Sequence, residues 1–183
     1  MSFVTRTLNR AGSVVVAAIV VSGVIGVPLA SHAGATSYTP TLSTFDSRLL
    51  ADFNHARTSR GIRALTVVAG TTDVAHGWSC HMAGVSLLSH DLRLGSLLET
   101  HGSYWWTTYG ENVGMTPSTS GADVLFRAYM ASPEHRANIL DRSYRYVGVW
   151  TKSARGLRWN TIDFVGSAIS SYRYSYGPTR RTC

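Results

Sequence analysis

The stretch YMASPEHRANIL, Tyr129–Leu140, places one histidine just where a helix should begin. Ser132 is a favourable N-cap residue, Pro133 suits the first helical position, and Glu134 adds a carboxylate to the first turn. These residues predict a short helix that begins after Ser132, with His135 beside its free backbone N–H groups. Taken alone, the stretch also fits a histidine with no role beyond the helix start.

The first 35 residues differ in composition from the rest of the chain. A start with two arginines and no acid, MSFVTRTLNR, precedes the almost wholly apolar AGSVVVAAIVVSGVIGVPLA and the small residues of SHAGA. This order is typical of a secretory signal peptide, so we expect cleavage after Ala33 or Ala35 and secretion of the protein. The alternative is a retained membrane anchor, because about 20 apolar residues can span a bilayer. Pro28, the interrupting glycines and the cleavage-like end favour removal.

The length and charge of the remaining chain indicate one basic domain. The 183 residues include 17 Lys and Arg against 10 Asp and Glu, and two of the arginines lie in the predicted signal peptide, which leaves a net charge near +5. Such an excess can favour adhesion to an anionic cell-envelope surface. The arginines are scattered and no nucleic-acid motif is present, so we expect no nucleic-acid partner.

Three helices are predicted from periodicity and capping residues. Residues 36–43 read as a polar linker, and Ser43 can cap a first helix, with Asp46 three residues later resembling a capping box. Gly61 suits the end of this helix. Further helices are expected to begin near Thr72 and around Ser120. The domain is expected to occupy 44–170, followed by a tail over 171–183.

The strands are predicted mainly near the C-terminal end. YRYVGVWT and LRWNTIDFVG alternate in polarity and are joined by KSARG, which indicates an antiparallel hairpin. Residues 84–121 read as mostly irregular, although YGENVGM within them can form a strand. Helices followed by a terminal hairpin indicate an α+β domain with helices over an antiparallel sheet.

Four short motifs carry a family resemblance. They are LLSHD with His90, YGENVG with Glu111, SPEHRANIL with His135, and YVGV at the start of the hairpin. In this order the chain resembles the superfamily of cysteine-rich secretory proteins, antigen 5 and pathogenesis-related-1 proteins, called CAP or SCP-domain proteins, and most of all its compact bacterial branch. The resemblance runs from about Leu49 to Gly166. It implies a three-layer α-β-α sandwich with a central antiparallel sheet and a cleft on one side.

The resemblance also implies a set of cleft residues. In the family the cleft commonly gathers two histidines and two acids, which match His90, His135 and Glu111 here, with Asn112 orienting the loop behind the glutamate. The second acid of animal and plant members falls on Ser132 in this chain. Glu134 is a poor substitute, because consecutive helical residues do not share a face.

Three functions follow from these residues as alternatives. The first is a secreted binding module whose cleft takes a divalent metal such as zinc on His90 and His135, with Glu111 as a further ligand, and a lipid or peptide nearby. Imidazole and carboxylate are ligand types that zinc accepts, but no zinc-motif spacing is present, so the metal rests on the resemblance.

The other two alternatives need no metal. One is a secreted peptidase- or esterase-like hydrolase with Glu111 and His135 as candidate catalytic residues. Ser132 as a nucleophile is the weaker form of this alternative, because the residue suits an N-cap and no Gly-x-Ser-x-Gly elbow is present. The last alternative is a structural or adhesive surface protein, in which the same side chains form a polar network.

The two cysteines, Cys80 and Cys183, can pair in an exported protein. A bridge between them would close a loop of about 100 residues and contribute roughly 4–5 kcal/mol in the chain-entropy description. The alternative is a buried, inert Cys80 and a free or intermolecular Cys183.

Overall fold

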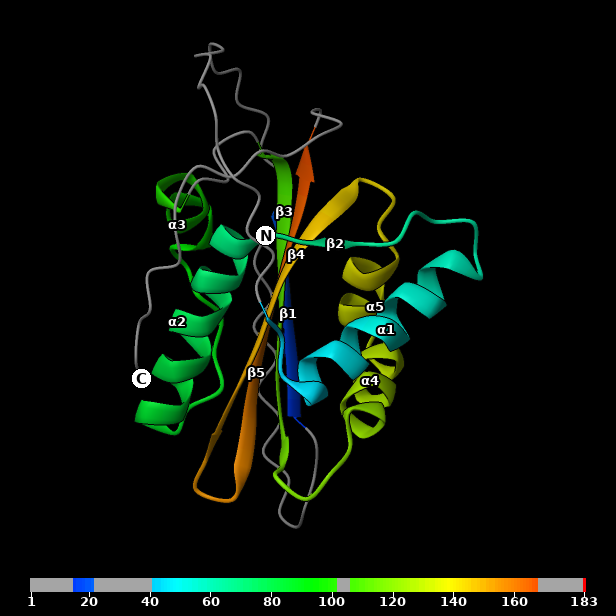
Figure 1. Ribbon diagram of the computed structural model, residues 1–183. Coiled ribbons are helices and arrows are strands. Elements are labelled where there is room, and N and C mark those ends of the chain that lie inside the picture. Colours follow the sequence, from blue (N-terminus) through cyan, green and yellow to red (C-terminus); the bar gives the residue numbers. More distant parts are fainter. Residues whose placement is uncertain (1–14, 22–40, 102–105, 168–182) are drawn as a thin grey trace.

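The computed structural model of the chain describes residues 15–21, 41–101, 106–167 and 183. The predicted cleavage site, most of the linker and most of the tail lie outside the described residues. Within them, ten elements follow one another (Figure 1): β1 (Val15–Val21), α1 (Thr44–Thr58), β2 (Thr66–Val67), α2 (Ala69–Val85), α3 (Leu94–Thr100), β3 (Trp106–Pro117), α4 (Ala122–Ala131), α5 (Pro133–Leu140), β4 (Tyr144–Ala154) and β5 (Leu157–Ser167).

The strands form one sheet in the order β1-β3-β5-β4-β2. All neighbours are antiparallel except the two-residue β2, which pairs in parallel with β4. Helices α2 and α3 lie on one side of this sheet, and α1, α4 and α5 lie on the other (Figure 1). The structure therefore has the three-layer α-β-α architecture that the sequence predicts.

Successive residues of β3 face the two different helical layers, because side chains alternate across a strand. Gly114 lies under Leu125 and Tyr129 of α4. Val113, the residue before it, belongs to the cluster of buried residues that Trp78 and other residues of α2 form. From Thr108 onward, beyond the irregularity between Trp106 and Thr108, even-numbered positions of β3 thus face α4 and α5, and odd-numbered positions face α2 and α3.

The helix limits follow the predicted caps at α1 and depart from prediction at α2 and α3. Ser43 Oγ accepts a hydrogen bond from the Asp46 N–H at 3.1 Å and donates to the Asp46 carboxylate at 2.7 Å. The chain turns away after α1 at Gly61, which has a φ of +64°. Helix α2 begins at Ala69, three residues before the predicted start, and α3 occupies part of a stretch predicted to be irregular.

The β4–β5 hairpin confirms the predicted pairing with a tighter turn. Pairing continues to Ala154 and Leu157, so that only Arg155 and Gly156 connect the strands. Both connecting residues have positive φ, 52° and 73°, as a two-residue hairpin turn requires. The glycine of YVGV also has a structural reason, because a Cβ at Gly148 would collide with the backbone of α2.

Arg57 joins α1 to the segment between α5 and β4. Its side chain is fully buried and donates to four backbone carbonyl groups, those of Arg63, Ile139, Asp141 and Tyr144, at 2.8–2.9 Å. Burial lowers the pKa of the guanidinium from its usual value.

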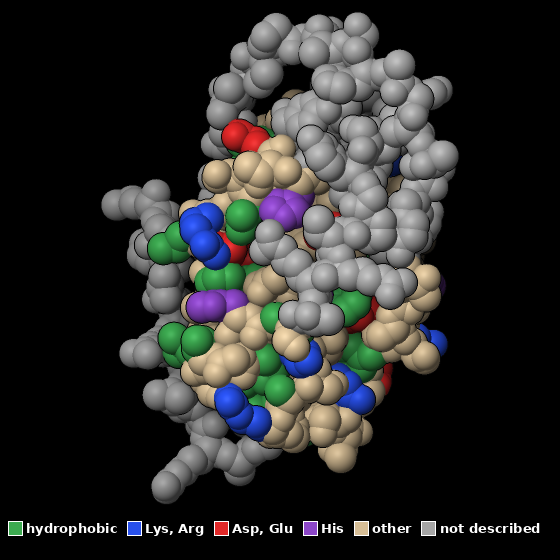
Figure 2. Space-filling view, turned by 60° about the vertical axis from the view of Figure 1, so that its left-hand side comes forward, with side chains coloured by type: hydrophobic (Ala, Val, Ile, Leu, Met, Phe, Trp, Pro, Cys, Tyr) green, Lys and Arg blue, Asp and Glu red, His purple; other side chains and the backbone are tan. Residues whose placement is uncertain are grey.

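The surface is basic without a basic stripe. Figure 2 shows Lys and Arg side chains distributed singly over the described part of one face, in agreement with the scattered arginines of the sequence. Among the helices in the described ranges, none combines the length and the apolar composition needed to cross a bilayer.

Candidate functional site

His90 and Glu111 form a close polar pair among the predicted site residues. His90 follows α2, Glu111 lies in β3, and His90 Nδ1 is 2.6 Å from Glu111 Oε1. The same oxygen accepts the backbone N–H of Asp91 at 3.1 Å, so Oε1 is an acceptor and we assign the proton to His90 Nδ1. The lone pair of the histidine is then on Nε2. Burial lowers the pKa of His90 from 6.5 to about 4, so the ring is neutral at physiological pH.

A second acid, Asp163 of β5, lies opposite Glu111 in the sheet register. Glu111 is 1% exposed and Asp163 is 0% exposed. Within the described part of the chain, Glu111 Oε2 and both carboxylate oxygens of Asp163 have no hydrogen-bond partner. Burial is the main cause that raises the pKa of each carboxyl group well above its usual value, and the neighbouring carboxyls raise the pKa of Asp163 further.

His135 lies in α5, where the sequence predicts it, and its ring contacts Tyr129 of the same helical layer. Its ring is 2% exposed and lies 5.2 Å from the ring of Tyr129 in α4. Ser132 occupies the N-cap position of α5, but its hydroxyl makes no capping bond to the backbone. Instead Ser132 Oγ lies 3.0 Å from the Glu134 carboxylate and 2.6 Å from His135 Nδ1. Because a hydroxyl has one proton and a carboxylate only accepts, we assign the Ser132 proton to Glu134 and the proton of the second bond to His135 Nδ1.

The predicted cleft residues are therefore divided between the two faces of the sheet. Glu111 is an odd-numbered residue of β3 and faces α2 and α3 together with His90. His135 packs in the α4 and α5 layer on the opposite face. Among the described residues, the ligand atoms of His90, Glu111 and His135 do not all three lie within 4.8 Å of one another.

Asn112 connects the motif YGENVG to the motif SPEHRANIL. Its amide donates to the backbone carbonyl of His135 at 3.2 Å, and its Oδ1 accepts from the Asn138 amide at 2.9 Å. The same Asn138 amide donates to the backbone carbonyl of Glu111 at 3.2 Å. A Cβ at Gly110 would lie 2.5 Å from the Tyr144 hydroxyl oxygen, so glycine is needed beside this contact. Asn112 thus ties β3 to α5.

The strand β1 lies along the edge of β3 at the site. Residues Val15–Val21 pair in antiparallel register with Tyr109–Met115, so that Ile19 is opposite Glu111 and Ala18 is opposite Asn112. The strand also lies against α5. Among the described strands, β1 is the only partner of β3 on this side. The segment that the sequence assigns to a removable signal peptide therefore occupies the edge of β3, opposite Glu111 in register and against α5.

Sequence reasoning missed Asp163, although a signal for it was present. In the strand NTIDFVG the acid stands between Ile162 and Phe164, which are fully buried. The side chain of Asp163 projects from the face opposite to that of Ile162 and Phe164. In a sheet with helices on one face only, such an acid is exposed, and in a sheet with helices on both faces it is buried. The two-sided sheet that the family resemblance implies was therefore sufficient to mark Asp163 as a buried acid opposite Glu111.

The fold is similar to solved structures of bacterial proteins. An extracellular protein with an SCP domain from Bacillus anthracis str. Ames is 23% identical, with a TM-score of 0.58 over 66% of this chain and 40% of that chain. An outer surface protein from Borrelia burgdorferi is 11% identical, with a TM-score of 0.61 over 72% and 99%. A cysteine-rich secretory protein from Staphylococcus aureus subsp. aureus Mu50 is 19% identical, with a TM-score of 0.55 over 67% and 38%.

The present chain spans about two fifths of the length of the Bacillus and Staphylococcus proteins. No curated protein sequence gives a significant match. The profile of the CAP family, described as the cysteine-rich secretory protein family, matches residues 50–175. This match covers more than half of the chain and includes all four motifs, so the protein belongs to the CAP family.

Proposed function

We propose that the mature protein is a secreted binding module that takes an extended apolar peptide along β3. The observation that carries the proposal is the seven-residue antiparallel pairing of Val15–Val21 with Tyr109–Met115. In the full chain this edge already holds a strand of sequence VVAAIVV. Removal of residues 1–35 would take that strand away and leave the backbone groups of β3 without it.

A vacated strand edge favours a peptide over a lipid. Each edge residue that faced β1 carries an N–H and a C=O group that require hydrogen-bond partners. A peptide backbone supplies both groups in register, whereas an acyl chain supplies neither. Strand addition to an exposed sheet edge is a general mode of peptide recognition. The hydrogen bond between the side-chain amides of Asn112 and Asn138 ties β3 to α5 and keeps the strand in position for such a peptide.

Secretion is supported by the N-terminal composition and by the similar proteins. The Bacillus protein is described as extracellular and the Borrelia protein as an outer surface protein. The first step of any test is therefore to sequence the N-terminus of protein recovered from the medium. We expect it to begin at Gly34 or Thr36, and membrane-pelleted full-length protein would instead indicate a retained anchor.

Peptide binding is tested with a fluorescent peptide of residues 13–23 that carries an added lysine at each end for solubility. We expect saturable binding to the processed protein and weaker binding to the full chain, in which β1 competes in cis. The matched control is the same peptide with Ala18→Pro, because proline removes a donor and interrupts the strand ladder. Equal binding of both peptides would reduce the effect to hydrophobic adsorption and contradict the proposal.

A divalent metal is the second candidate, supported by the orientation of His90. The Glu111 carboxyl accepts from Nδ1, which is the arrangement that presents Nε2 of a histidine to a metal. Asp163 supplies the second acid that Ser132 does not. The donor types fit zinc, whereas the donor atoms are not gathered as they stand. His90 and Asp163 would hold the ion, and zinc would supply Lewis acidity there.

Zinc calorimetry on the processed protein separates the two versions of a metal site. If His90 and Asp163 bind the ion, His90→Ala abolishes the heat and His135→Ala leaves it unchanged. If both histidines bind, as the sequence predicts, each variant abolishes it. Equal heats for wild type and the double variant would exclude a metal on either histidine.

The hydrolase alternative has less geometric support. Ser132 and His135 are in contact, but we assign the single hydroxyl proton of Ser132 to its bond with the Glu134 carboxylate. A serine nucleophile needs the reverse, a hydroxyl that donates to the histidine. A peptidase and esterase panel with a Glu111→Gln control tests it. Absence of peptide binding, zinc binding and turnover together would favour the structural or adhesive alternative.

A further inference from the structure

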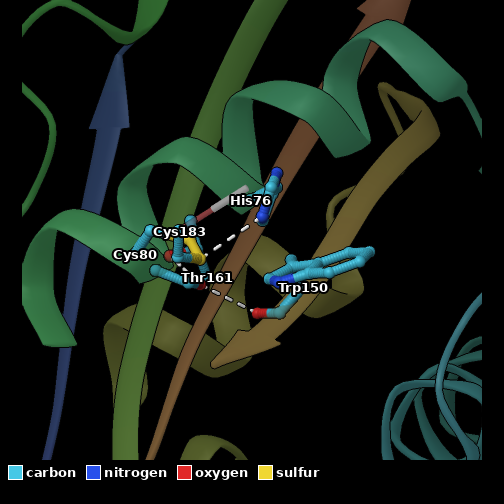
Figure 3. Close-up of a disulfide and its surroundings, with 6 residues drawn as sticks. His76, Cys80, Trp150, Thr161 and Cys183 are labelled. Carbon is cyan, nitrogen blue, oxygen red and sulfur yellow. Dashed lines mark hydrogen bonds between the residues drawn. A yellow bond between two sulfur atoms is a disulfide. The ribbon is translucent and has the colours of Figure 1, made fainter. Parts of the chain in front are cut away.

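A second group of metal-ligand side chains lies on α2, away from the His90–Glu111 pair. His76 and Cys80 are one helical turn apart on α2, and Cys80 forms a disulfide with Cys183 (Figure 3). The ligand atoms of these three residues all lie within 4.8 Å of one another. No other group of three such side chains with this spacing occurs in the described part of the chain.

The separation of the nitrogen and sulfur atoms matches a shared tetrahedral metal. His76 Nε2 lies 3.4 Å from Cys183 Sγ. Zinc binds sulfur at about 2.3 Å and imidazole nitrogen at about 2.0–2.1 Å, so two such ligands on one tetrahedral ion are roughly 3.6 Å apart. The histidine is therefore already at ligand distance from one sulfur, and Cys80, at position i+4 on the same helix, faces the same side.

The surroundings hold His76 and the helix in this position. The ring of His76 lies 4.5 Å from the ring of Trp150 in β4. The neighbouring Ser79 hydroxyl donates to the Trp150 carbonyl at 3.0 Å and lies 2.9 Å from the Thr161 hydroxyl of β5, which fixes this turn of α2 to the sheet. Cys183 is exposed and the other two ligands are half-buried, so solvent and ions can reach the group.

We propose that His76, Cys80 and Cys183 form a redox-controlled site for zinc, which binds when the disulfide is reduced. A dithiol reductant attacks the exposed Cys183 sulfur, and the Cys80 sulfur leaves and takes a proton. The second thiol of the reductant then releases Cys183 and becomes part of the reductant's own disulfide. Two electrons thus reach the protein as two thiols. Zinc displaces one proton from each thiol and binds two thiolates, His76 and a water molecule.

The oxidised and the metal-bound states exclude each other, because the sulfurs of a disulfide carry no thiolate charge for the metal. The site would therefore convert the loss of one cross-link into the gain of another at the same place. Both links tie Cys183 to α2. The CAP domain would keep this attachment under reducing conditions only when the metal is present.

The experiment uses the secreted protein with Co²⁺ as the spectroscopic probe. After reduction with a phosphine and removal of the reductant under nitrogen, we expect one equivalent of cobalt to give a thiolate-to-cobalt charge-transfer band and tetrahedral visible bands. Zinc should displace the cobalt. The oxidised protein should show no such band, and cobalt at His90 would lack the thiolate transition.

The ligand variant is His76→Ala, and the control is His81→Ala on the same helix. His76→Ala should weaken cobalt binding at least about tenfold, since even outer-shell partners contribute that much. His81→Ala should bind as the wild type does. Equal affinity of all three proteins would overturn the histidine's role. Absence of the band in reduced protein would overturn the site itself, whether circular dichroism shows that protein folded or unfolded.

Discussion

Glu111 on β3 and Asp163 on β5 lie directly opposite each other in the sheet register, and both carboxyl groups are buried. Two adjacent acids in an interior of low polarity cannot both ionise without a large cost. Burial raises the pKa of each group well above its usual value, and the presence of Glu111 raises that of Asp163 further. Burying these two carboxyl groups therefore lowers the stability of the fold, which retains a polar site at this position.

The first prediction is that Asp163→Asn stabilises the protein at neutral pH by about 1 kcal/mol or more, because a neutral amide is less costly to bury than a carboxylate. The direction with pH follows from the raised pKa. Above the unfolded pKa near 4, the native state holds more protons than the unfolded state, so wild-type stability falls as the pH rises. The unfolding free energy of the variant should fall less steeply with rising pH than that of the wild type. Urea unfolding between pH 5 and pH 8 measures both effects, and a variant less stable than wild type at pH 7 would contradict them.

The second prediction concerns His90. Burial lowers the pKa of its ring to about 4. Its folded pKa lies below the unfolded value of 6.5, so its contribution to stability is present above pH 6.5. That contribution is lost as the pH falls through 6.5 towards 4. NMR of the ring protons should show His90 neutral down to about pH 5. A His90 midpoint at or above 6.5 would mean that an ionised Glu111 stabilises the protonated ring, and it would contradict the prediction.

The third prediction concerns Arg57, which donates to four buried or partly buried carbonyl groups. Arg57→Met keeps most of the side-chain volume and leaves these groups without a donor, so we expect a loss of at least about 3 kcal/mol in unfolding free energy. Arg48→Met on the same helix removes a pair with Asp52 in which the arginine is 68% exposed, and should cost less than about 1 kcal/mol. Denaturant midpoints for the two variants measure the difference. Similar losses would show that Arg57 has no special structural role.

Features that depend on local chemistry were predictable from the sequence. The cap formed by Ser43 and Asp46, the turn at Gly61 and the β4–β5 hairpin depend on residues close together in the chain. The start of α5 at Pro133 belongs to the same class. The family motifs added the three-layer arrangement, which no local pattern contains.

Features that depend on distant contacts were not predictable in this way. Helix α3 has no side-chain cap at Arg93, and its stability comes from Leu94 and Leu98 packing in the apolar cluster that includes Trp106 and Val165. Glu111 and His135 lie on opposite faces of the sheet because of the side of β3 from which the Glu111 side chain projects. A shift of one residue in β3 would reverse that direction.

The central claim is that the β3 edge between Tyr109 and Met115 is a strand-binding site that residues 15–21 fill in the full chain. Hydrogen–deuterium exchange over 109–115 tests it directly, with three samples: the full chain, the processed protein, and the processed protein with the peptide of residues 13–23. Roughly half of these amides face β1, because alternate residues pair with opposite neighbours. We predict that these amides exchange slowly in the full chain, faster in the processed protein, and slowly again when the peptide is added. Equal exchange in all three samples would contradict the account.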